Sequence, residues 1–125
     1  MTANIRPKRT WRRVDGVLLL DKPQGMTSNA ALQSARRLYS AAKAGHTGTL
    51  DPMATGLLPV CFGEATKFSA DLLEADKTYE ADVLFGVTTN TGDADGEVLE
   101  RRIPLFGQVE LENVLQRFHG TIKQI

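Results

Sequence analysis

The sequence predicts an α+β fold in which a mixed, mainly antiparallel sheet carries flanking helices. Two patterns support this class. Apolar residues recur at helical spacing after residue 28 and again after residue 110, whereas they alternate at strand spacing from Tyr79 to Val87. Short apolar runs between glycine- and proline-containing turns supply further strands, so helices and strands are interspersed along the chain.

The first half of the chain is expected to contain two strands around a helix. VDGVLLLDKP is typical of a buried strand that ends at Lys22 and Pro23. Thr27 or Ser28 can cap a helix that continues to about Ala42, since its apolar residues share one helical face. LLPVCF is then expected to form a short buried strand.

The second half is expected to add two helices and further strands. GEATKFSADLLEAD predicts an amphipathic helix whose apolar residues, Ala65, Phe68, Leu72 and Leu73, face inward. KTYEADVLFGVTT predicts a strand, NTGDADGEV a turn and EVLERRI a returning strand. LENVLQRF predicts a helix closed by Gly120, and TIKQI starts another strand.

The composition is that of a soluble globular domain. With 125 residues, 42% hydrophobic and 24% charged, the chain has enough length for one modest core. It contains no apolar run near the roughly 18 residues of a membrane helix and no signal-peptide pattern. The single cysteine, Cys61, is expected to be a small buried residue, and together these features favour a reducing cytoplasm.

A net charge of zero conceals two oppositely charged halves. Residues 1–50 carry nine lysines and arginines against two acids, a net +7, and residues 51–125 carry six against thirteen, a net −7. The basic half starts with RPKRTWRR, interpreted as a basic N-terminal tail over residues 1–13 whose first ten residues are expected to be disordered. A mitochondrial-type leader is the alternative interpretation.

Further basic residues follow this tail. Arg36 and Arg37 lie off the apolar face of the predicted helix, so we expect them to be free for solvent or a ligand, and Lys43 follows closely. A basic half of this kind favours a polyanionic partner, and these three residues are candidates for contact with an RNA backbone.

The segment AGHTGTLDPMATGLLPV is unusual for a loop. Its glycines let backbone approach a ligand, its prolines stiffen it, and apolar residues follow directly. We expect Leu50, Met53, Leu57 and Leu58 to form a dry wall around Asp51. A carboxylate held in this way is suited to act as nucleophile, general base or stabiliser of a developing cation. A turn-capping role is the alternative for an aspartate that precedes a proline.

Other common sites do not fit the sequence. GEATK lacks the spacing of a phosphate-binding loop. A calcium loop counted from Thr91 would need a glutamate at its twelfth position, where Arg102 stands. His46, His119 and Cys61 are too few for a zinc site, so no metal is expected.

Four segments, taken in order, carry a more specific signal: DGVLLLDKPQGMTSN, GHTGTLDPMATGLLPVCFGEATKFS, DKTYEADVLFGVTTNTGDADGEV and FHGTIKQI. They resemble, respectively, the N-terminal motif, the catalytic motif, the following strand and turn, and the entry to the next block of the tRNA pseudouridine synthase B family. Members of that family isomerise uridine 55 in the T-arm loop of tRNA. The resemblance runs from about Asp15 to the C-terminus and implies the pseudouridine synthase fold, incomplete in this chain.

The resemblance also implies roles for individual residues. Asp51 corresponds to the catalytic aspartate, Tyr79 to the active-site tyrosine packed against the target base, and His46 to the histidine that helps to hold the flipped-out conformation. Lys22 and Pro23 match positions that look mainly architectural, and Lys22 is grouped with the substrate-binding candidates. Core packing for Tyr79 and a loop hydrogen bond for His46 are the alternative interpretations.

The chain departs from the family pattern in two respects. Asn90 stands where the family usually has aspartate. The later basic residue that pairs with the family's catalytic aspartate, the remaining strands and the C-terminal RNA-binding PUA domain have no counterpart in this sequence. Residues 14–125 are therefore expected to be the N-terminal portion of a truncated catalytic domain that is inactive alone.

The chemistry of uridine isomerisation agrees with these assignments. Detaching uracil from C1′ of its ribose builds cationic character on the sugar, which a carboxylate stabilises, and the uracil must first be flipped out of the T loop. The expected partner is tRNA, through its T-arm loop, with no cofactor, metal or membrane, and the full-length protein is expected to be a cytoplasmic monomer. A non-catalytic RNA-binding fragment is the alternative, and a small metal-free hydrolase built on Asp51 and His46 is a more distant one.

Overall fold

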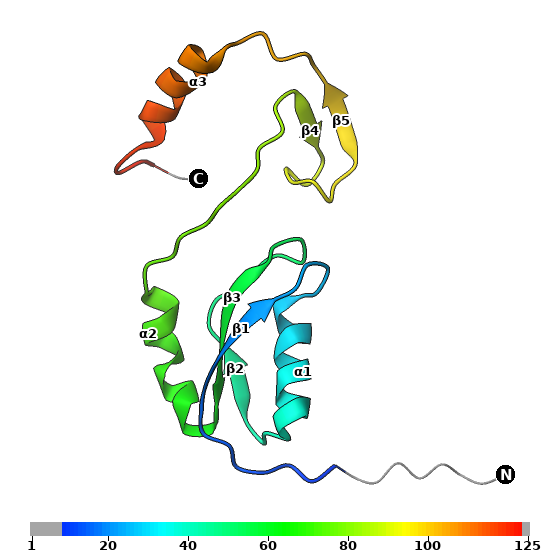
Figure 1. Ribbon diagram of the computed structural model, residues 1–125, viewed down its shortest axis with the longest axis vertical. Helices are drawn as coiled ribbons and strands as arrows, with labels where there is room; N and C mark the ends of the chain where they lie inside the picture. Colours follow the sequence, from blue (N-terminus) through cyan, green and yellow to red (C-terminus); the bar gives the residue numbers. More distant parts are fainter. Residues whose placement is uncertain (1–8, 124–125) are drawn as a thin grey trace, which may run out of the picture. The chain divides into compact units, whose positions relative to one another are not determined.

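The computed structural model describes residues 9–123 and divides the chain into two compact units, Met1–Thr78 and Tyr79–Ile125 (Figure 1). Each unit has its own antiparallel sheet and its own helices, so the predicted α+β class is confirmed. Within the described residues, no helix has the length and apolar composition that crossing a membrane requires.

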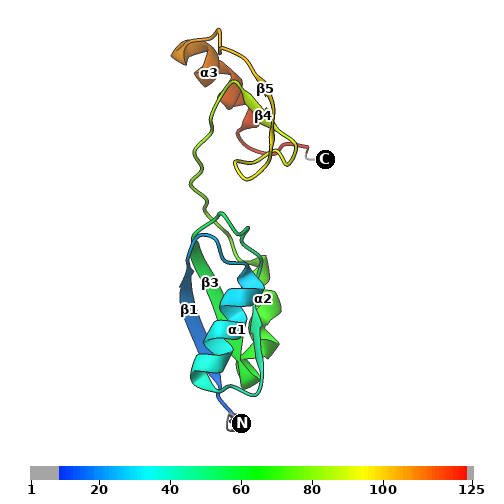
Figure 2. The same ribbon diagram turned by 90° about the vertical axis from the view of Figure 1, so that its right-hand side faces the viewer.

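The N-terminal unit is built on a three-stranded antiparallel sheet with the strand order β1-β3-β2. Its elements are β1 (Gly16–Lys22), α1 (Ser28–Tyr39), β2 (Ala44–His46), β3 (Gly56–Phe62), the 3-10 helix η1 (Gly63–Phe68) and α2 (Ser69–Glu74). The central strand, β3, pairs along its whole length with β1, and α1 runs along the sheet (Figure 2). The strands β1 and β3 and the helix α1 occur where the sequence predicts them, whereas β2 lies inside the segment expected to be a loop.

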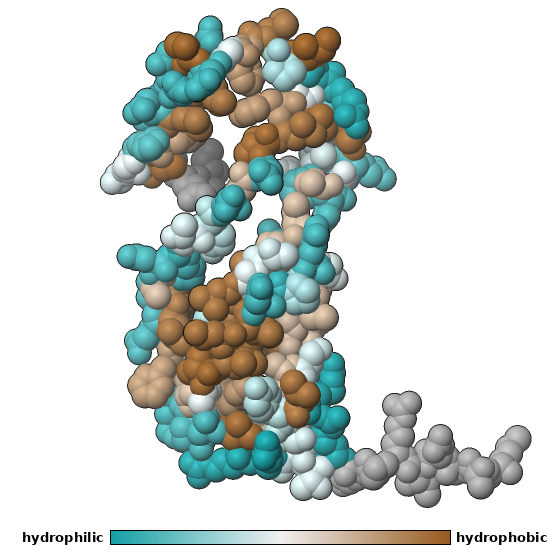
Figure 3. Space-filling view, viewed as in Figure 1, coloured by the Kyte–Doolittle hydropathy of each residue, from teal (hydrophilic) through white to brown (hydrophobic). Residues whose placement is uncertain are grey.

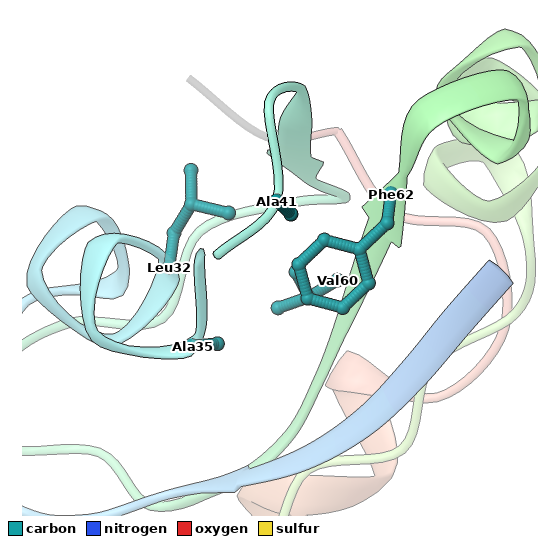
Figure 4. Close-up of a cluster of buried hydrophobic side chains, with 5 residues drawn as sticks. All are labelled: Leu32, Ala35, Ala41, Val60 and Phe62. Atoms are coloured by element: carbon teal, nitrogen blue, oxygen red, sulfur yellow. The ribbon is translucent and has the colours of Figure 1, made fainter. Parts of the chain in front are cut away.

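The core of this unit lies between α1 and β3. Leu32 and Ala35 from α1 and Ala41 after it meet Val60 and Phe62 from β3 (Figure 4). Alternate residues of β1 add to this cluster from the same face of the sheet, as the two-residue period of a strand requires. The apolar faces that the sequence predicts for this helix and these strands therefore pack together in one core.

The opposite face of β1 and β3 is apolar and only partly covered. Val17 and Leu19 alternate with the core residues of β1, and Leu57 of β3 lies on the same face. All three are exposed, Leu19 to 68%. Figure 3 shows the result as a brown patch over β1 and β3.

Helix α1 begins where predicted and ends earlier than predicted. Thr27 is the N-cap, and its Oγ1 accepts a hydrogen bond from Ala30 N at 3.1 Å. At the other end, Ser40 adopts the left-handed conformation, with φ 52° and ψ 34°, and its N–H bonds back to carbonyls of the last turn. The predicted continuation to Ala42 is wrong because this left-handed residue ends the helix.

The end of the expected basic tail is attached to this helix terminus. Arg12 N donates to Ser40 O at 2.8 Å, and Arg12 O accepts from Ala42 N at 2.9 Å. Arg12, inside the expected tail, is therefore bound rather than loose. The first part of the expected tail, residues 1–8, lies outside the described residues.

The single helix predicted over GEATKFSADLLEAD is wrong. The segment forms η1 and then α2, and Phe68 and Leu73, which were expected to face inward, are exposed. A 3-10 helix has three residues per turn, so side chains spaced for an α-helix do not stay on one face across such a junction.

The C-terminal unit consists of a hairpin followed by a helix. Its elements are β4 (Val87–Thr89), β5 (Val98–Arg101), α3 (Gln108–Leu115) and the 3-10 helix η2 (Gln116–Phe118). Asn90 closes the turn, since its Oδ1 accepts a hydrogen bond from Glu97 N at 2.9 Å. The predicted turn and returning strand are confirmed. The predicted last helix is confirmed in part, since LENVLQRF begins inside α3 and ends in the 3-10 helix η2.

The strand predicted over KTYEADVLFGVTT is wrong for most of its length. Only its last three residues form β4, and the segment from Tyr79 to Leu84 has no regular structure. Its residues alternate as a strand requires, but among residues 9–123 no strand pairs with them, and a strand is stable only within a ladder. Of TIKQI, the first three residues also have no regular structure, and the last two lie outside the described residues.

Candidate functional site

The candidate site is the loop that joins β2 to β3, residues 47–55, which we call the aspartate loop. The β2–β3 ladder fixes the start of this loop, with His46 opposite Val60, and the β1–β3 ladder fixes its end, with Lys22 opposite Gly56. Asp51 lies in its middle. Two other parts of the N-terminal unit reach the loop and hold the residues on each side of the aspartate.

The residue before Asp51 is held by Ser28, the first residue of α1. Ser28 Oγ donates to Leu50 O at 3.0 Å and accepts from Leu50 N at 2.9 Å. One hydroxyl therefore satisfies both backbone polar groups of Leu50. Ser28 is 2% exposed, so water does not compete for these bonds.

The other flank of the aspartate is held from the end of β1. Pro52 O accepts from Gly25 N at 2.7 Å and from Lys22 Nζ at 3.4 Å. Lys22 is fully buried, and Nζ also donates to the carbonyls of Pro23 at 2.9 Å and Met26 at 2.7 Å. Lys22 thus ties the turn after β1 to the aspartate loop.

His46 closes the start of the loop. Its Nδ1 lies 2.6 Å from Gly48 O, and Nδ1 carries the proton because a carbonyl only accepts. Gly48 has φ +77°, a conformation that residues with a side chain rarely adopt. The loop hydrogen bond, which is the alternative interpretation of His46, is therefore present. Within the described residues, the other ring nitrogen, Nε2, has no hydrogen-bond partner.

The Asp51 side chain is exposed. In the part of the chain that the structure describes, its carboxylate forms no ion pair and accepts no hydrogen bond. The expected dry wall is wrong, because Leu57 and Leu58 are neighbours on β3 and point to opposite faces, the first into solvent and the second inward. Leu50 and Met53 are only half-buried.

Tyr79 is the first residue of the C-terminal unit and belongs to a different unit from Asp51. Its side chain is 70% exposed and lies in the irregular segment before β4. Core packing, the alternative weighed for Tyr79, is therefore wrong. An exposed aromatic ring is available for stacking on a base.

Arg36 is not free, contrary to the prediction. Its Nε donates to Ala41 O at 3.1 Å and its Nη2 to Ala42 O at 2.9 Å, and the Trp11 ring centroid lies 4.6 Å from the guanidinium carbon. The reason is general, because carbonyls that follow the last turn of a helix lack intrahelical partners and attract a cation. Arg36 therefore joins the N-terminal segment to the end of α1.

The other two basic candidates remain accessible. Arg37 and Lys43 are both exposed. Within residues 9–123, the Arg37 guanidinium donates one hydrogen bond, to the hydroxyl of Ser34 at 3.3 Å, and the Lys43 ammonium has no hydrogen-bond partner.

Among residues 9–123, no three histidine, cysteine or acidic side chains gather as metal ligands do. Cys61 is fully buried, and burial raises the pKa of its thiol, as expected of a packing residue rather than a nucleophile. In the calcium-like turn, Asp93 accepts from the Thr91 hydroxyl at 2.6 Å and from Asp95 N at 3.0 Å. These bonds lower the pKa of Asp93, and the carboxylate serves the turn itself.

The contact between Ser28 and the aspartate loop was not predicted. In the sequence, Thr27 and Ser28 are alternative caps for one helix, although a single cap is sufficient. The available signal was the spare hydroxyl, because a buried serine needs a hydrogen-bond partner. The partner itself was out of reach of pattern reasoning, since Leu50 lies 22 residues further along the chain.

Comparison with known proteins places this site in context. The family described as TruB family pseudouridylate synthase (N terminal domain) matches residues 36–125. The protein named tRNA pseudouridine synthase B from Dechloromonas aromatica (strain RCB) is 68% identical over 118 residues, which are 94% of this chain and 40% of that protein. The protein of the same name from Burkholderia mallei (strain ATCC 23344) is 60% identical over 124 residues, which are 99% of this chain and 40% of that protein.

The chain thus spans about 40% of the length of these relatives. Among solved structures, it is similar to one described as "Structure of H/ACA RNP bound to a substrate RNA containing 2'-deoxyuridine", with a TM-score of 0.45 and 45% sequence identity. That similarity covers 46% of this chain and 18% of the other. The family match includes the aspartate loop and Tyr79 and starts after Lys22 and Ser28.

Proposed function

This chain belongs to the TruB family of pseudouridylate synthases, and from that membership we propose that it serves an enzyme that converts uridine 55, in the T-arm loop of tRNA, to pseudouridine. The name shared by its relatives, tRNA pseudouridine synthase B, supports tRNA as the substrate. Because the chain spans about 40% of those proteins, the activity is proposed for a protein in which it is joined to the rest of a catalytic domain.

The aspartate loop is the observation that carries the proposal. The residues on both sides of Asp51 are hydrogen-bonded to buried side chains, Leu50 to Ser28 and Pro52 to Lys22. The carboxylate itself is exposed and has no partner among the described residues. A fixed backbone with an unoccupied reactive group is the arrangement that positioning and electrostatic catalysis require.

The reaction explains why a carboxylate belongs there. Breaking the bond between C1′ and N1 of uridine builds positive charge on the sugar, which Asp51 stabilises by its charge or by covalent attack. The uracil then turns and bonds to C1′ through C5, after which C5 loses its proton and N1, freed from the sugar, gains one. The reaction is an isomerisation, so no atom is gained or lost between substrate and product.

Three further residues have proposed roles around that step. Tyr79 stacks on the flipped uracil, which its exposed ring supports. His46 contacts the RNA through Nε2, since Nδ1 is occupied by Gly48 O. Lys22 acts from below the surface by holding the aspartate loop, because its ammonium is fully buried.

Arg37 and Lys43 are proposed to contact the RNA backbone. Both are exposed and lie in the basic half of the chain. Phosphate contacts by such residues release counterions, so binding of tRNA should weaken as salt is added. Arg36 is left out of this set because its guanidinium is bound to the end of α1.

The test is a fused enzyme in which residues 1–125 replace the matching segment of the Dechloromonas aromatica relative. The fused enzyme is incubated with a tRNA transcript, and pseudouridine is mapped by carbodiimide labelling and primer extension. We expect pseudouridine at position 55 and none in a transcript with cytidine at that position. Tight binding without modification would instead support a non-catalytic RNA-binding role, and modification elsewhere would overturn the assigned position.

A further inference from the structure

Ser28 stands out among the groups around the aspartate loop because it does not serve its own helix. The N-terminus of α1 is already capped by Thr27, whose Oγ1 accepts from Ala30 N. The hydroxyl of Ser28 turns away from the helix and binds Leu50 with both its donor and its acceptor capacity. Helix α1 thereby contacts the residue directly before Asp51.

We propose that Ser28 is a positioning residue for Asp51, which fixes the direction in which the carboxylate leaves the loop. This role rests on the proposed function, because it concerns the aspartate that the reaction uses. Ser28 touches neither the carboxylate nor the reacting atoms, and it acts through the backbone of Leu50.

The planarity of the peptide bond shows how the effect is transmitted. Leu50 O and Asp51 N belong to one rigid peptide plane, so the bond from Ser28 Oγ to Leu50 O fixes the plane before Asp51. Asp51 O accepts from Ala54 N at 3.0 Å, which fixes the plane after it. With both planes held, the backbone of Asp51 has little freedom.

The loop sequence shows why such an anchor is needed. The loop contains Gly48, and the strand after it starts with Gly56, whose φ is +122°. Glycine has the greatest backbone freedom, so the loop sequence alone does not fix the aspartate. Pro52 biases the backbone of Asp51, the residue before it, toward extended conformations, but it does not fix the peptide plane between Leu50 and Asp51. A buried hydroxyl at the end of a helix supplies a rigid reference that the loop lacks.

The chain offers a matched control in the neighbouring residue. Ser28→Ala removes both bonds to Leu50 and keeps the Thr27 cap. Thr27→Ala removes the cap and keeps the bonds to Leu50. Both variants lose one hydroxyl at the same helix terminus, so a loss of helix stability alone would affect them alike.

The first measurement is amide hydrogen exchange by NMR in the 125-residue chain, with the amides of β3 as internal reference. We expect the Leu50 amide to exchange faster in Ser28→Ala and at its parent rate in Thr27→Ala, where the Ala30 amide should be affected instead. An unchanged Leu50 amide in Ser28→Ala would show that the anchor does not hold in solution and would overturn the proposal.

The second measurement is steady-state kinetics of the fused enzyme on tRNA. We expect Ser28→Ala to lower kcat by roughly 10- to 100-fold, the usual cost of a misplaced catalytic group. KM should stay near the parent value, because the RNA-binding surface is untouched. Thr27→Ala should leave both constants near the parent values.

The outcomes separate this proposal from the function on which it rests. A parent fusion that forms no pseudouridine contradicts the proposed function. An active parent with an undiminished kcat in Ser28→Ala, or with a change confined to KM, contradicts the positioning role of Ser28 alone. Equal losses of kcat in Ser28→Ala and Thr27→Ala would also contradict it, because helix stability would then explain both.

Discussion

Lys22 is the largest fully buried side chain among the described residues, and it carries an ammonium group. Burying an ammonium is unfavourable unless its donors find acceptors, and three main-chain carbonyls supply them. Two of these carbonyls lie in the turn after β1, and the third, that of Pro52, lies in the aspartate loop 30 residues away. A single side chain therefore fixes the relation between two segments that the chain leaves far apart.

Replacing that ammonium should destabilise the N-terminal unit. Lys22→Met keeps the length of the side chain but removes the donor from the carbonyls of Pro23 and Met26, while that of Pro52 keeps Gly25 N. We therefore expect the free energy of unfolding to fall by about 1–3 kcal/mol. Urea unfolding at neutral pH measures the change. The control is Lys43→Met at an exposed site, which should stay within about 0.5 kcal/mol of the parent. Equal effects of the two variants would rule out a structural role for the buried ammonium.

Asp15 links stability to pH. Its Oδ1 accepts from Glu64 N at 2.7 Å, and its Oδ2 lies 3.1 Å from Arg13 Nε. The Glu64 bond first, and Arg13 after it, hold the pKa of Asp15 below its ordinary value of 3.8. Because the pKa of Asp15 is lower in the folded protein than in the unfolded chain, the ionised carboxylate stabilises the fold at pH values above the ordinary pKa of 3.8. This stabilisation is lost as the pH falls through the lowered pKa.

We expect Asp15→Asn to remove this part of the acid response. The difference in unfolding free energy between the parent and Asp15→Asn should be largest near neutral pH and should shrink from about pH 5 to about pH 2. Asp76→Asn is the control, because Asp76 makes no hydrogen bond among the described residues. Denaturant unfolding at several pH values gives both series, and a difference for Asp15→Asn that stays constant with pH would contradict the assignment.

At the scale of elements, agreement between sequence and structure depends on where each element finds its partners. Helix α1 and the strands β1 and β3 carry their own apolar stripes, and the stripes meet in one core, so periodicity was sufficient to predict them. Strand β2 has only three residues, including a glycine, and exists because the edge of β3 offers a ladder. The opposite case is the segment from Tyr79 to Leu84, which alternates well but has no strand beside it among the described residues.

The candidate site likewise has features that the sequence predicts and features that it does not. The position of Asp51 in a constrained loop was predictable from its glycines and prolines. The contacts of Ser28 and Lys22 with the loop were not, because they join residues 22 and 30 positions apart. The exposure of the Asp51 carboxylate was not predicted. Whether the Leu57 side chain points to the core or to solvent depends on the register of β3, which the sequence pattern does not give.

The end of α1 offers a test at this scale. Ser40 has φ 52° and ψ 34°, a conformation that costs a residue with a side chain about 1–2 kcal/mol and costs glycine little. Ser40→Gly should therefore raise the free energy of unfolding by up to about 1 kcal/mol, after the larger entropy of glycine in the unfolded chain is subtracted.

The control for this substitution lies in the same helix. Ser34→Gly places glycine in the exposed interior of α1, where it should lower the free energy of unfolding by about 0.5 kcal/mol. Thermal and urea unfolding of both variants check the pair. Destabilisation of similar size at both positions would contradict the left-handed assignment of Ser40.

At the scale of the whole molecule, the two units differ in how well they bury their apolar residues. The N-terminal unit has a core between α1 and β3. In the C-terminal unit, no residue from 79 to 123 is buried, and Leu105 is 94% exposed. Since burial of apolar surface is the main favourable term in folding, the C-terminal unit taken by itself has little to stabilise it.

We therefore expect the two units to behave differently in the isolated chain. Amides of β1 and β3 should be protected from hydrogen exchange, whereas amides of residues 79–123 should exchange rapidly. Exposed apolar side chains should also make the chain associate as its concentration rises, which sedimentation velocity measures. A monomer at all concentrations with a protected C-terminal unit would show that this unit is stable on its own.

The central claim, that Asp51 is the catalytic group of a pseudouridine synthase, is tested most directly by one substitution in the fused enzyme. Asp51→Asn keeps the size and polarity of the side chain and removes its charge and nucleophilicity. Turnover is followed as release of tritium from C5-labelled uridine in tRNA. The control is Asp71→Asn, an exposed acid of α2 outside the aspartate loop. We expect Asp51→Asn to lose at least about a thousandfold in kcat while it still binds tRNA, and Asp71→Asn to match the parent. Turnover by Asp51→Asn at a rate close to that of the parent would contradict the account.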